Sequence, residues 1–332
     1  MTRFKTSLRT LLLLFTLFAT LQAWAVNDLV AEFPKLFETG NHAGLYAGSS
    51  YIKNRLEQNP AEKIGFSAED LALTDYYHML CLKTFQFDKT LNAAPVHKAM
   101  AAAFGDDNYM TLIAKALSMP YEQTTVDYIV KTAIPAIEEQ VGEEAWEIGY
   151  LIAQAGDVYA NMGDMPKAIS MLDAANCQHA DNGRATSWFT MLNHMQLAYL
   201  KIVNDNFKVT TGEPDLNKSL DLDKVLSEGD VIGPTINSHY YLMWMMNADG
   251  QSQSVIDFSK GHFQMMEVMG LKDTEPWYVH QYTIGNCYVA LGNKKEAAKI
   301  FADVKAGYER LGMSGSDAHQ QVCNRIEWLK KQ

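Results

Sequence analysis

The stretch IGNCYVALGNKKEAAKIF, residues 284–301, decides the fold of this chain, because an earlier stretch, AGDVYANMGDMPKAISML at residues 155–172, carries the same pattern. The matching positions keep a constant offset of 129 residues, and they pair Gly156, Tyr159, Gly163, Ala168 and Leu172 with Gly285, Tyr288, Gly292, Ala297 and Phe301. Small residues that face large ones across a tight turn allow two antiparallel helices to pack closely. The pattern therefore predicts a stack of helical hairpins.

Helical spacing of apolar residues continues along almost the whole chain, and strand-type alternation is nearly absent. We therefore expect an all-α fold of about seven hairpins and a C-terminal capping helix. The expected helices cover residues 27–39, 43–58, 67–87, 89–104, 107–118, 121–140, 143–162, 165–180, 184–204, 217–228, 235–248, 251–269, 274–291, 294–311 and 316–331.

Short local signals mark the ends of these helices. Gly163 and Gly292 follow apolar helices, where glycine supplies the left-handed backbone that ends a helix. Ser67 with Asp70 resembles a capping box, and Ser316 is an N-cap candidate. The run from 206 to 216 is too long for a tight turn, so we expect a loop insertion there.

The first 25 residues have the pattern of a cleavable signal peptide. Three basic residues precede an apolar run at residues 11–21, and Ala23 and Ala25 supply the small residues of a cleavage site after Ala25. An uncleaved membrane anchor is the alternative. We expect export to the periplasm of a Gram-negative bacterium, with full secretion as the second option, and no membrane span in the mature chain.

The charge balance excludes some partners. The chain has 28 basic and 39 acidic residues and a formal net charge of −11. Removal of the signal peptide, which carries three basic and no acidic residues, leaves 25 against 39, a net charge of −14. Such a surface argues against nucleic acid and anionic lipid, and it is compatible with a basic protein partner.

The duplicated pattern resembles the tetratricopeptide repeat (TPR) family, whose signature is Leu-Gly-x2-Tyr on the first helix and Ala-x3-Phe on the second. Ile284 precedes Gly285 here, and Ala155 precedes Gly156. The period of 43 is longer than the usual ~34, and a HEAT-like array of period ~40–47 is the alternative. The resemblance implies a right-handed superhelical stack of antiparallel hairpins, a TPR-like α-solenoid.

The resemblance also implies an organisation of the chain and a binding surface. The expected parts are a signal peptide at 1–25, divergent N-terminal hairpins at 26–140, and TPR-like repeats at 141–332 with the loop insertion near 206–216 and the capping helix at 316–331. In TPR proteins the first helices line a groove that holds a peptide or a helix. By register, the groove residues are Asp157, Asn161, Tyr240, Trp244, Tyr282, Asn286 and Val289.

No motif of a known catalytic site is present, so we expect a non-catalytic protein-binding scaffold in envelope assembly or sensing. The alternative is a protein that binds a metal or a small molecule through the Met- and aromatic-rich hairpins at 235–270. Helix-spaced Met243, Met245, Met246, Met265, Met266 and Met269 are expected in the core.

No cofactor is expected, and the oligomeric state stays open. His78 with Cys81 and Cys177 with His179 are isolated pairs, and two ligands do not make a structural zinc site. The four cysteines allow three disulfide connectivities. Buried thiols are an equal alternative, and Cys287 with Cys323 is the first pair to test.

Overall fold

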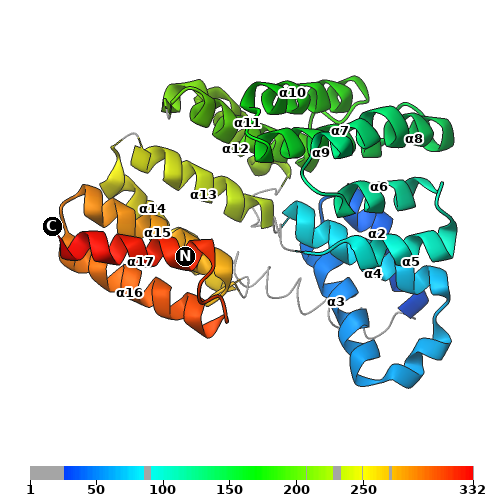
Figure 1. Ribbon diagram of the computed structural model, residues 1–332, viewed down its shortest axis with the longest axis horizontal. Coiled ribbons are helices and arrows are strands. Elements are labelled where there is room, and N and C mark those ends of the chain that lie inside the picture. The colour runs from blue at the N-terminus through cyan, green and yellow to red at the C-terminus, as the bar shows by residue number, and fades with distance from the viewer. Residues whose placement is uncertain are drawn as a thin grey trace. The chain divides into compact units, whose positions relative to one another are not determined.

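The computed structural model describes residues 26–85, 91–206, 208–226, 233–248, 250–268 and 271–331 (Figure 1). These residues form helices and no strand, which confirms the all-α fold class. The expected signal peptide lies outside the described residues.

The α-helices match the expected ranges closely at most ends. They are α2 Val26–Glu38, α3 His42–Gln58, α4 Ala68–Phe85, α5 Ala94–Phe104, α6 Tyr109–Ser118, α7 Gln123–Tyr128, α8 Ile134–Val141, α9 Trp146–Asn161, α10 Met165–Asp181, α11 Trp188–Asn204, α12 Glu213–Leu226, α13 Gly233–Ala248, α14 Ser252–Val268, α15 Glu275–Ala290, α16 Lys294–Arg310 and α17 Asp317–Lys330.

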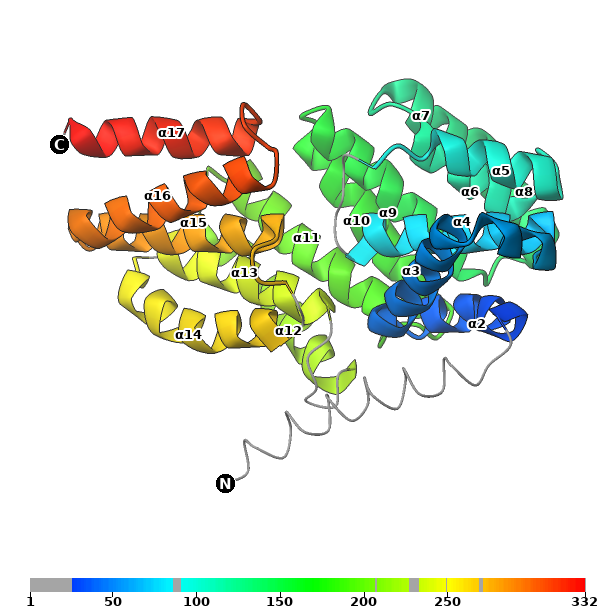
Figure 2. The same cartoon turned by 90° about the horizontal axis from the view of Figure 1, so that it is seen from below.

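The chain forms two compact units, which we describe separately. Unit 1 comprises the described residues of Met1–Asn206 and Thr211–Pro234, and unit 2 comprises those of Phe207–Thr210 and Thr235–Gln332. In unit 1, α9 to α12 pack successively against one another (Figure 1). In unit 2, α15 packs against α14 and α16, and α17 packs against α16, so that these helices lie in a stack (Figure 2).

The glycine and alanine positions of the repeated pattern lie where the helices of a hairpin meet. A Cβ atom at Gly285 would lie 2.9 Å from Cδ1 and Cζ of Phe301, so only glycine lets that ring approach α15. At Gly156 the nearest atom, the carbonyl oxygen of Ala168, would lie 3.2 Å away. Ala168, Ala297 and Phe301 are fully buried. The close helix contact that the pattern predicts is therefore present in both hairpins.

The tight turns of these hairpins have the expected backbone chemistry. Gly163 and Gly292 have φ angles of 83° and 73°, in the left-handed region. In the second turn, the backbone N–H of Asn293 donates to the carbonyl of Tyr288 at 2.8 Å, and its side chain accepts from Glu296 N–H. These bonds use backbone groups that the end of one helix and the start of the next leave unpaired. Local residues thus specify the same tight turn in both hairpins that carry the repeated pattern.

Two expected helix N-termini also carry their predicted caps. The hydroxyl of Ser67 accepts from the backbone N–H of Asp70, whose carboxylate accepts from Ser67 N–H. Ser316 accepts from the backbone N–H of His319. These local bonds, reciprocal at Ser67 and Asp70, explain why the helix starts could be read from the sequence.

Aromatic contacts join the N-terminal helices of unit 1 to its later hairpins. The ring of Phe37 in α2 lies 5.1 Å from the rings of Trp146 in α9 and Trp188 in α11. The indole N–H of Trp188 donates to the carbonyl of Glu38 at 3.0 Å. The expected boundary near residue 140 lies inside this unit, because these contacts tie α2 to segments more than 100 residues away.

Helices α5 and α11 begin later than expected, at Ala94 and Trp188, and two other stretches differ more. The helix expected at 121–140 is interrupted by a π-helical turn at Ile129–Ala133, where Ile134 N–H bonds to the carbonyl of Ile129. Pro135 follows this turn and has no N–H to continue the regular ladder, which accounts for the interruption.

The loop expected at 206–216 is shorter than its sequence suggested. Val209–Thr211 forms a 3-10 turn, and α12 already begins at Glu213. Gly212 packs against α11, where a Cβ atom would lie 2.6 Å from Cγ1 of Ile202. Asp215 in the first turn of α12 pairs with Lys201 at 2.8 Å. Through these contacts the segment packs against α11, and the apolar spacing of the segment itself did not predict them.

All four cysteines are free thiols in the structure. Cys81 and Cys287 are buried, Cys323 is half-buried and Cys177 is exposed. The disulfide considered between Cys287 and Cys323 is therefore not formed. Cys287 instead packs with Met243, Val255 and Ile284 in the core of unit 2.

Candidate functional site

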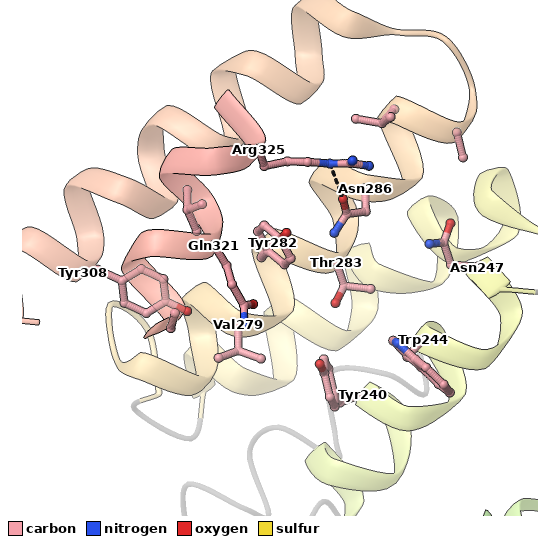
Figure 3. Close-up of a pocket in the computed structure, with 14 residues that line it drawn as sticks. Tyr240, Trp244, Asn247, Val279, Tyr282, Thr283, Asn286, Tyr308, Gln321 and Arg325 are labelled. Atoms are coloured by element: carbon pink, nitrogen blue, oxygen red, sulfur yellow. Dashed lines mark hydrogen bonds between the residues drawn. The ribbon is translucent and has the colours of Figure 1, made fainter. Parts of the chain in front are cut away.

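A cavity of about 560 Å³ lies in unit 2. Helices α13, α15 and α17 supply most of its walls, and α16 contributes one residue (Figure 3). Its lining residues are Tyr240, Trp244, Asn247, Val279, Tyr282, Thr283, Asn286, Val289, Ala290, Tyr308, Ala318, Gln321, Val322 and Arg325.

The spacing of these residues explains why they face one space. On α13 the lining residues are three or four positions apart, as are the steps from Val279 to Tyr282 and from Thr283 to Asn286 on α15. Residues so spaced share one face of a helix. Helices α13 and α15 are the first helices of successive hairpins, and α17 follows the second hairpin. The repeat therefore turns one face of each of these helices toward the cavity.

A hydrogen bond between two helices organises the polar part of the cavity. Nε of Arg325 in α17 donates to Oδ1 of Asn286 in α15 at 3.0 Å, and the amide nitrogen of Asn286 points away from Arg325 (Figure 3). The guanidinium also lies over the ring of Trp328, 4.5 Å from its centroid. Two neighbours thus hold the guanidinium, and its bond to Oδ1 orients the Asn286 amide.

The aromatic wall formed by Tyr240 rests on buried histidines. The Tyr240 ring stacks on His280 at 4.5 Å with an interplanar angle of 11°. Nδ1 of His280 lies 2.7 Å from Nε2 of His262, and both imidazoles are almost fully buried. Burial lowers the pKa of His262 to about 3 and holds the pKa of His280 well below its usual value. Both rings are therefore neutral at physiological pH, and the wall carries no charge.

The cavity has one formally charged lining residue, Arg325. Tyr308 is nearly fully buried, and this burial, followed by the nearby carboxylate of Glu275, raises the pKa of its phenol. Tyr308 is consequently a neutral hydroxyl. The arrangement offers aromatic faces, hydroxyls and amides around a single cation, and its lining residues include no carboxylate or thiol.

Five of the seven residues expected in a groove line this cavity: Tyr240, Trp244, Tyr282, Asn286 and Val289. The other two, Asp157 and Asn161, lie on α9 in unit 1. Asp157 lines a separate pocket of about 190 Å³, and Nδ2 of Asn161 donates to the backbone carbonyl of Asp157 at 2.8 Å. The structure thus groups the residues expected from the last two hairpins and leaves the earlier pair in another unit.

Several lining residues were not singled out from the sequence. Asn247 and Thr283 share helix faces with expected residues, so helical spacing could have identified them. Gln321 and Arg325 are four positions apart on α17, which sequence analysis treated only as a cap. Tyr308 belongs to a second helix, and no signal in the sequence placed it at the cavity.

The methionines that suggested a soft metal site belong to the core where the structure describes them. Met243, Met245 and Met266 are buried, and Met246 packs against the cluster that contains Met243. The side chain of Met265 and all of Met269 lie outside what is described. Within the described residues, no group of three or more His, Cys, Asp or Glu side chains is arranged to hold a metal ion.

The two isolated His and Cys pairs that the sequence analysis set aside as metal ligands lie in unit 1. His179 is fully buried against the ring of Phe189 at 5.0 Å, whereas its neighbour Cys177 is exposed. Nδ1 of His78 lies 2.9 Å from Oγ of Ser49, and Cys81 is buried. The histidines of both pairs are accordingly packing residues.

Comparison with known proteins found similar folds among solved structures but no match in sequence. No protein-family model matches the chain, and no curated protein matches it in sequence. The solved APC/C hetero-tetramer Cut9–Hcn1 is similar in structure, with a TM-score of 0.54 and 17% identity over 91% of this chain and 48% of that one. This chain therefore spans about half the length of the matched chain in that assembly.

The nearly identical TPR-like repeats of a Podosopora anserina protein described as a kinesin light chain also match. Their TM-score is 0.46 with 15% identity, over 62% of this chain and 95% of theirs, and a point variant of the same repeats matches with a TM-score of 0.47. The fold is TPR-like. In this TPR-like chain the described helices include none that is both long and apolar enough to cross a bilayer.

Proposed function

We propose that this TPR-like chain is a non-catalytic scaffold that binds an extended segment of a partner protein in the cavity of unit 2. The observation that carries the proposal is the 560 Å³ space walled by the first helices of two successive hairpins and by α17. Its walls combine aromatic faces with side-chain amides, which suits an amphipathic peptide better than a small apolar molecule.

The chemistry of the lining supports a peptide ligand in two ways. Amide groups such as Asn247 and Gln321 can donate to and accept from peptide bonds at once, so they bind a backbone with little regard for its sequence. Tyr240, Trp244 and Tyr282 supply the large ring surfaces that usually anchor a partner. Binding of this kind needs no bond-making step, and the lining includes no nucleophile with an adjacent base.

The proposed setting is the bacterial envelope. It rests on the signal-peptide pattern of residues 1–25, with cleavage after Ala25. Within the periplasm the scaffold would act in envelope assembly or in sensing. Mass spectrometry of the protein from a periplasmic extract should give a mature N-terminus at Val26, whereas retention of Met1 would contradict export with cleavage.

Site-specific photocrosslinking in living cells tests the binding site. A photoreactive amino acid at Val289, which lines the cavity, should capture a discrete partner. The same group at Lys299, an exposed residue of α16 outside the cavity, is the matched control.

Trp244→Ala should reduce capture from position 289 by about 10-fold or more. The reason is that truncation of an aromatic anchor typically costs about 2 kcal/mol of binding free energy. Thermal melting of the variant shows whether unit 2 stays folded. Equal capture from positions 289 and 299, or capture that a folded Trp244→Ala variant leaves intact, would remove the cavity as the binding site.

A further inference from the structure

Unit 1 contains two adjoining pockets, a wide pocket of about 190 Å³ and a narrow pocket of about 40 Å³. Lys83 of α4 and both Gln154 and Asp157 of α9 line each of them, so the two spaces meet at these side chains. One water molecule needs about 10–15 Å³ of such space. The narrow pocket therefore admits only a group of a few atoms, whereas the wide pocket has room for a small molecule.

Two buried side chains of the narrow pocket carry polar atoms that the fold leaves unpaired. Asn193 on α11 is 5% exposed, and His179 on α10 is fully buried. Nδ2 of Asn193 and both ring nitrogens of His179 have no hydrogen-bond partner among the described residues. Buried polar groups are nearly always hydrogen-bonded in folded proteins, because an unpaired one is destabilising. A bound molecule with hydrogen-bonding groups at this end would complete both side chains.

The chemistry of these unpaired atoms selects a neutral group that both donates and accepts. Burial lowers the pKa of His179 to about 4, so its imidazole is neutral at physiological pH and offers one N–H donor and one acceptor. Asn193 adds an NH₂ donor. A hydroxyl group donates and accepts through a single atom of the size of a water oxygen, so it matches both the donor set and the small volume. A carboxylate has no donor for the imidazole acceptor, and an ammonium has no acceptor for the NH₂ group.

The lining of the wide pocket is suited to the remainder of a neutral, hydroxyl-rich molecule. Its formally charged lining residues are Lys83 and Asp157, one of each sign, so the lining favours neither an anion nor a cation by net charge. Asn92 and Gln154 supply amides, and Tyr121, which is 43% exposed, supplies an aromatic ring. A sugar ring has hydroxyls around its rim and C–H groups on its faces, and these C–H groups can pack on an aromatic ring.

From these observations we propose that the two pockets of unit 1 bind a neutral monosaccharide. Its ring lies in the wide pocket, and one hydroxyl or hydroxymethyl group enters the narrow pocket beside Asn193 and His179. This inference goes beyond the proposed function, because it concerns another unit and another class of ligand. The chain then carries one site for a segment of a partner protein and a separate site for a sugar.

Ligand-observed NMR with the full-length chain tests the proposal. The probes are the neutral aldohexoses and aldopentoses, each titrated singly, and we expect saturable binding of at least one of them. For the sugar that binds best, counterparts with a carboxylate or an ammonium group in place of one hydroxyl should bind about 10-fold more weakly, because a charge entering this lining gains no net opposite charge. Tighter binding of either charged counterpart, or no binding by any neutral sugar, would overturn the proposal and leave ordered water as the occupant of the narrow pocket.

A matched pair of variants on α11 then locates the bound sugar. Asn193→Leu replaces the unpaired amide by an apolar group of similar size, so it should weaken the best sugar about 10-fold. Without sugar, the same change should leave the melting temperature unchanged or raise it, because it removes an unpaired buried donor. Asn204→Leu is the control, since Asn204 is exposed and lies outside both pockets, and it should not change the affinity.

The variants keep the proposal falsifiable. If Asn193→Leu lowers the melting temperature, His179→Phe is the second variant, because it removes both ring nitrogens and keeps a planar ring; it should weaken the sugar by a similar factor. Unchanged affinity in a folded variant at either position would overturn the site. The proposals for the two units fail separately, because sugar titration reports on unit 1 and crosslinking from position 289 reports on unit 2.

Discussion

The ring of Phe301 occupies the space into which any side chain on Gly285 would project. A Cβ atom at Gly285 would lie 2.9 Å from both Cδ1 and Cζ of that ring and nearer still to Cε1. Phe301 is fully buried, so it has little room to move aside. The small residue of the repeated pattern is therefore the direct reason that α15 and α16 approach so closely.

Gly285→Ala should consequently destabilise unit 2 by about 1–3 kcal/mol through overpacking. The matched control is Gly261→Ala in α14, where a Cβ atom would meet nothing within 4 Å. There the higher helix propensity of alanine should stabilise by up to about 1 kcal/mol. Urea unfolding followed by circular dichroism measures both changes, and a destabilisation of the same size at both glycines would contradict the packing assignment.

The buried pair His262 and His280 should make unit 2 sensitive to acid. In the folded state burial lowers the pKa of both imidazoles below the ordinary value of 6.5, and the pKa of His262 is about 3. The folded state therefore binds fewer protons than the unfolded state as the pH falls below 6.5. The contribution of these rings to stability is complete above about pH 6.5 and is lost progressively below it, by up to about 1.4 kcal/mol per pH unit for each ring.

His262→Gln should therefore make the decline in unfolding free energy between pH 6.5 and pH 4.5 less steep. The expected change in slope corresponds to about one proton fewer taken up on unfolding. His97→Gln, a change on α5 in unit 1, is the control and should leave the decline in unit 2 unaltered. Urea midpoints over this pH range are the measurement. An unchanged slope in folded His262→Gln would show that the imidazole pair is not the titrating element.

Glu147 should have the opposite pH dependence in unit 1. This carboxyl is 7% exposed, and burial raises its pKa to about 7. A raised carboxyl pKa means that the folded state prefers the protonated form, so stability is present below the unfolded value of about 4.5 and declines as pH rises toward 7. Glu147→Gln should stabilise unit 1 by about 1 kcal/mol or more at pH 8 and by little at pH 4.5. A gain of equal size at both values would exclude titration of Glu147 as the cause.

Thiol reactivity should separate the cysteines into two classes. Burial raises the pKa of Cys81 to about 12 and that of Cys287 to about 11, and neither side chain is exposed. Both should resist iodoacetamide at pH 8 until the chain unfolds, whereas the exposed Cys177 should react in the native state. Mass spectrometry after timed alkylation counts the modified sites. A Cys287–Cys323 disulfide recovered under non-reducing conditions would contradict the free thiols.

Local chemistry explains why most of the helical order could be predicted. The caps at Ser67 and Ser316 and the left-handed Gly163 and Gly292 use bonds between residues only a few positions apart. Such contacts form wherever their sequence occurs, so helix ends and tight turns are readable without tertiary information. The π-helical turn before Pro135 shows the limit of this reading, because apolar spacing carries no sign of a changed hydrogen-bond ladder.

The sequence by itself determined the all-α class, the hairpin repeat and the faces that carry Tyr240, Trp244, Tyr282 and Asn286, because these depend on helical period and on turn residues. Only the tertiary structure showed which faces share a cavity and that Nε of Arg325 donates to Oδ1 of Asn286, which lies 39 residues earlier in the chain. It also showed that Asp157 lies in a different unit from those residues. Contacts between distant helices depend on how side chains pack in three dimensions, and that information is not local in the chain.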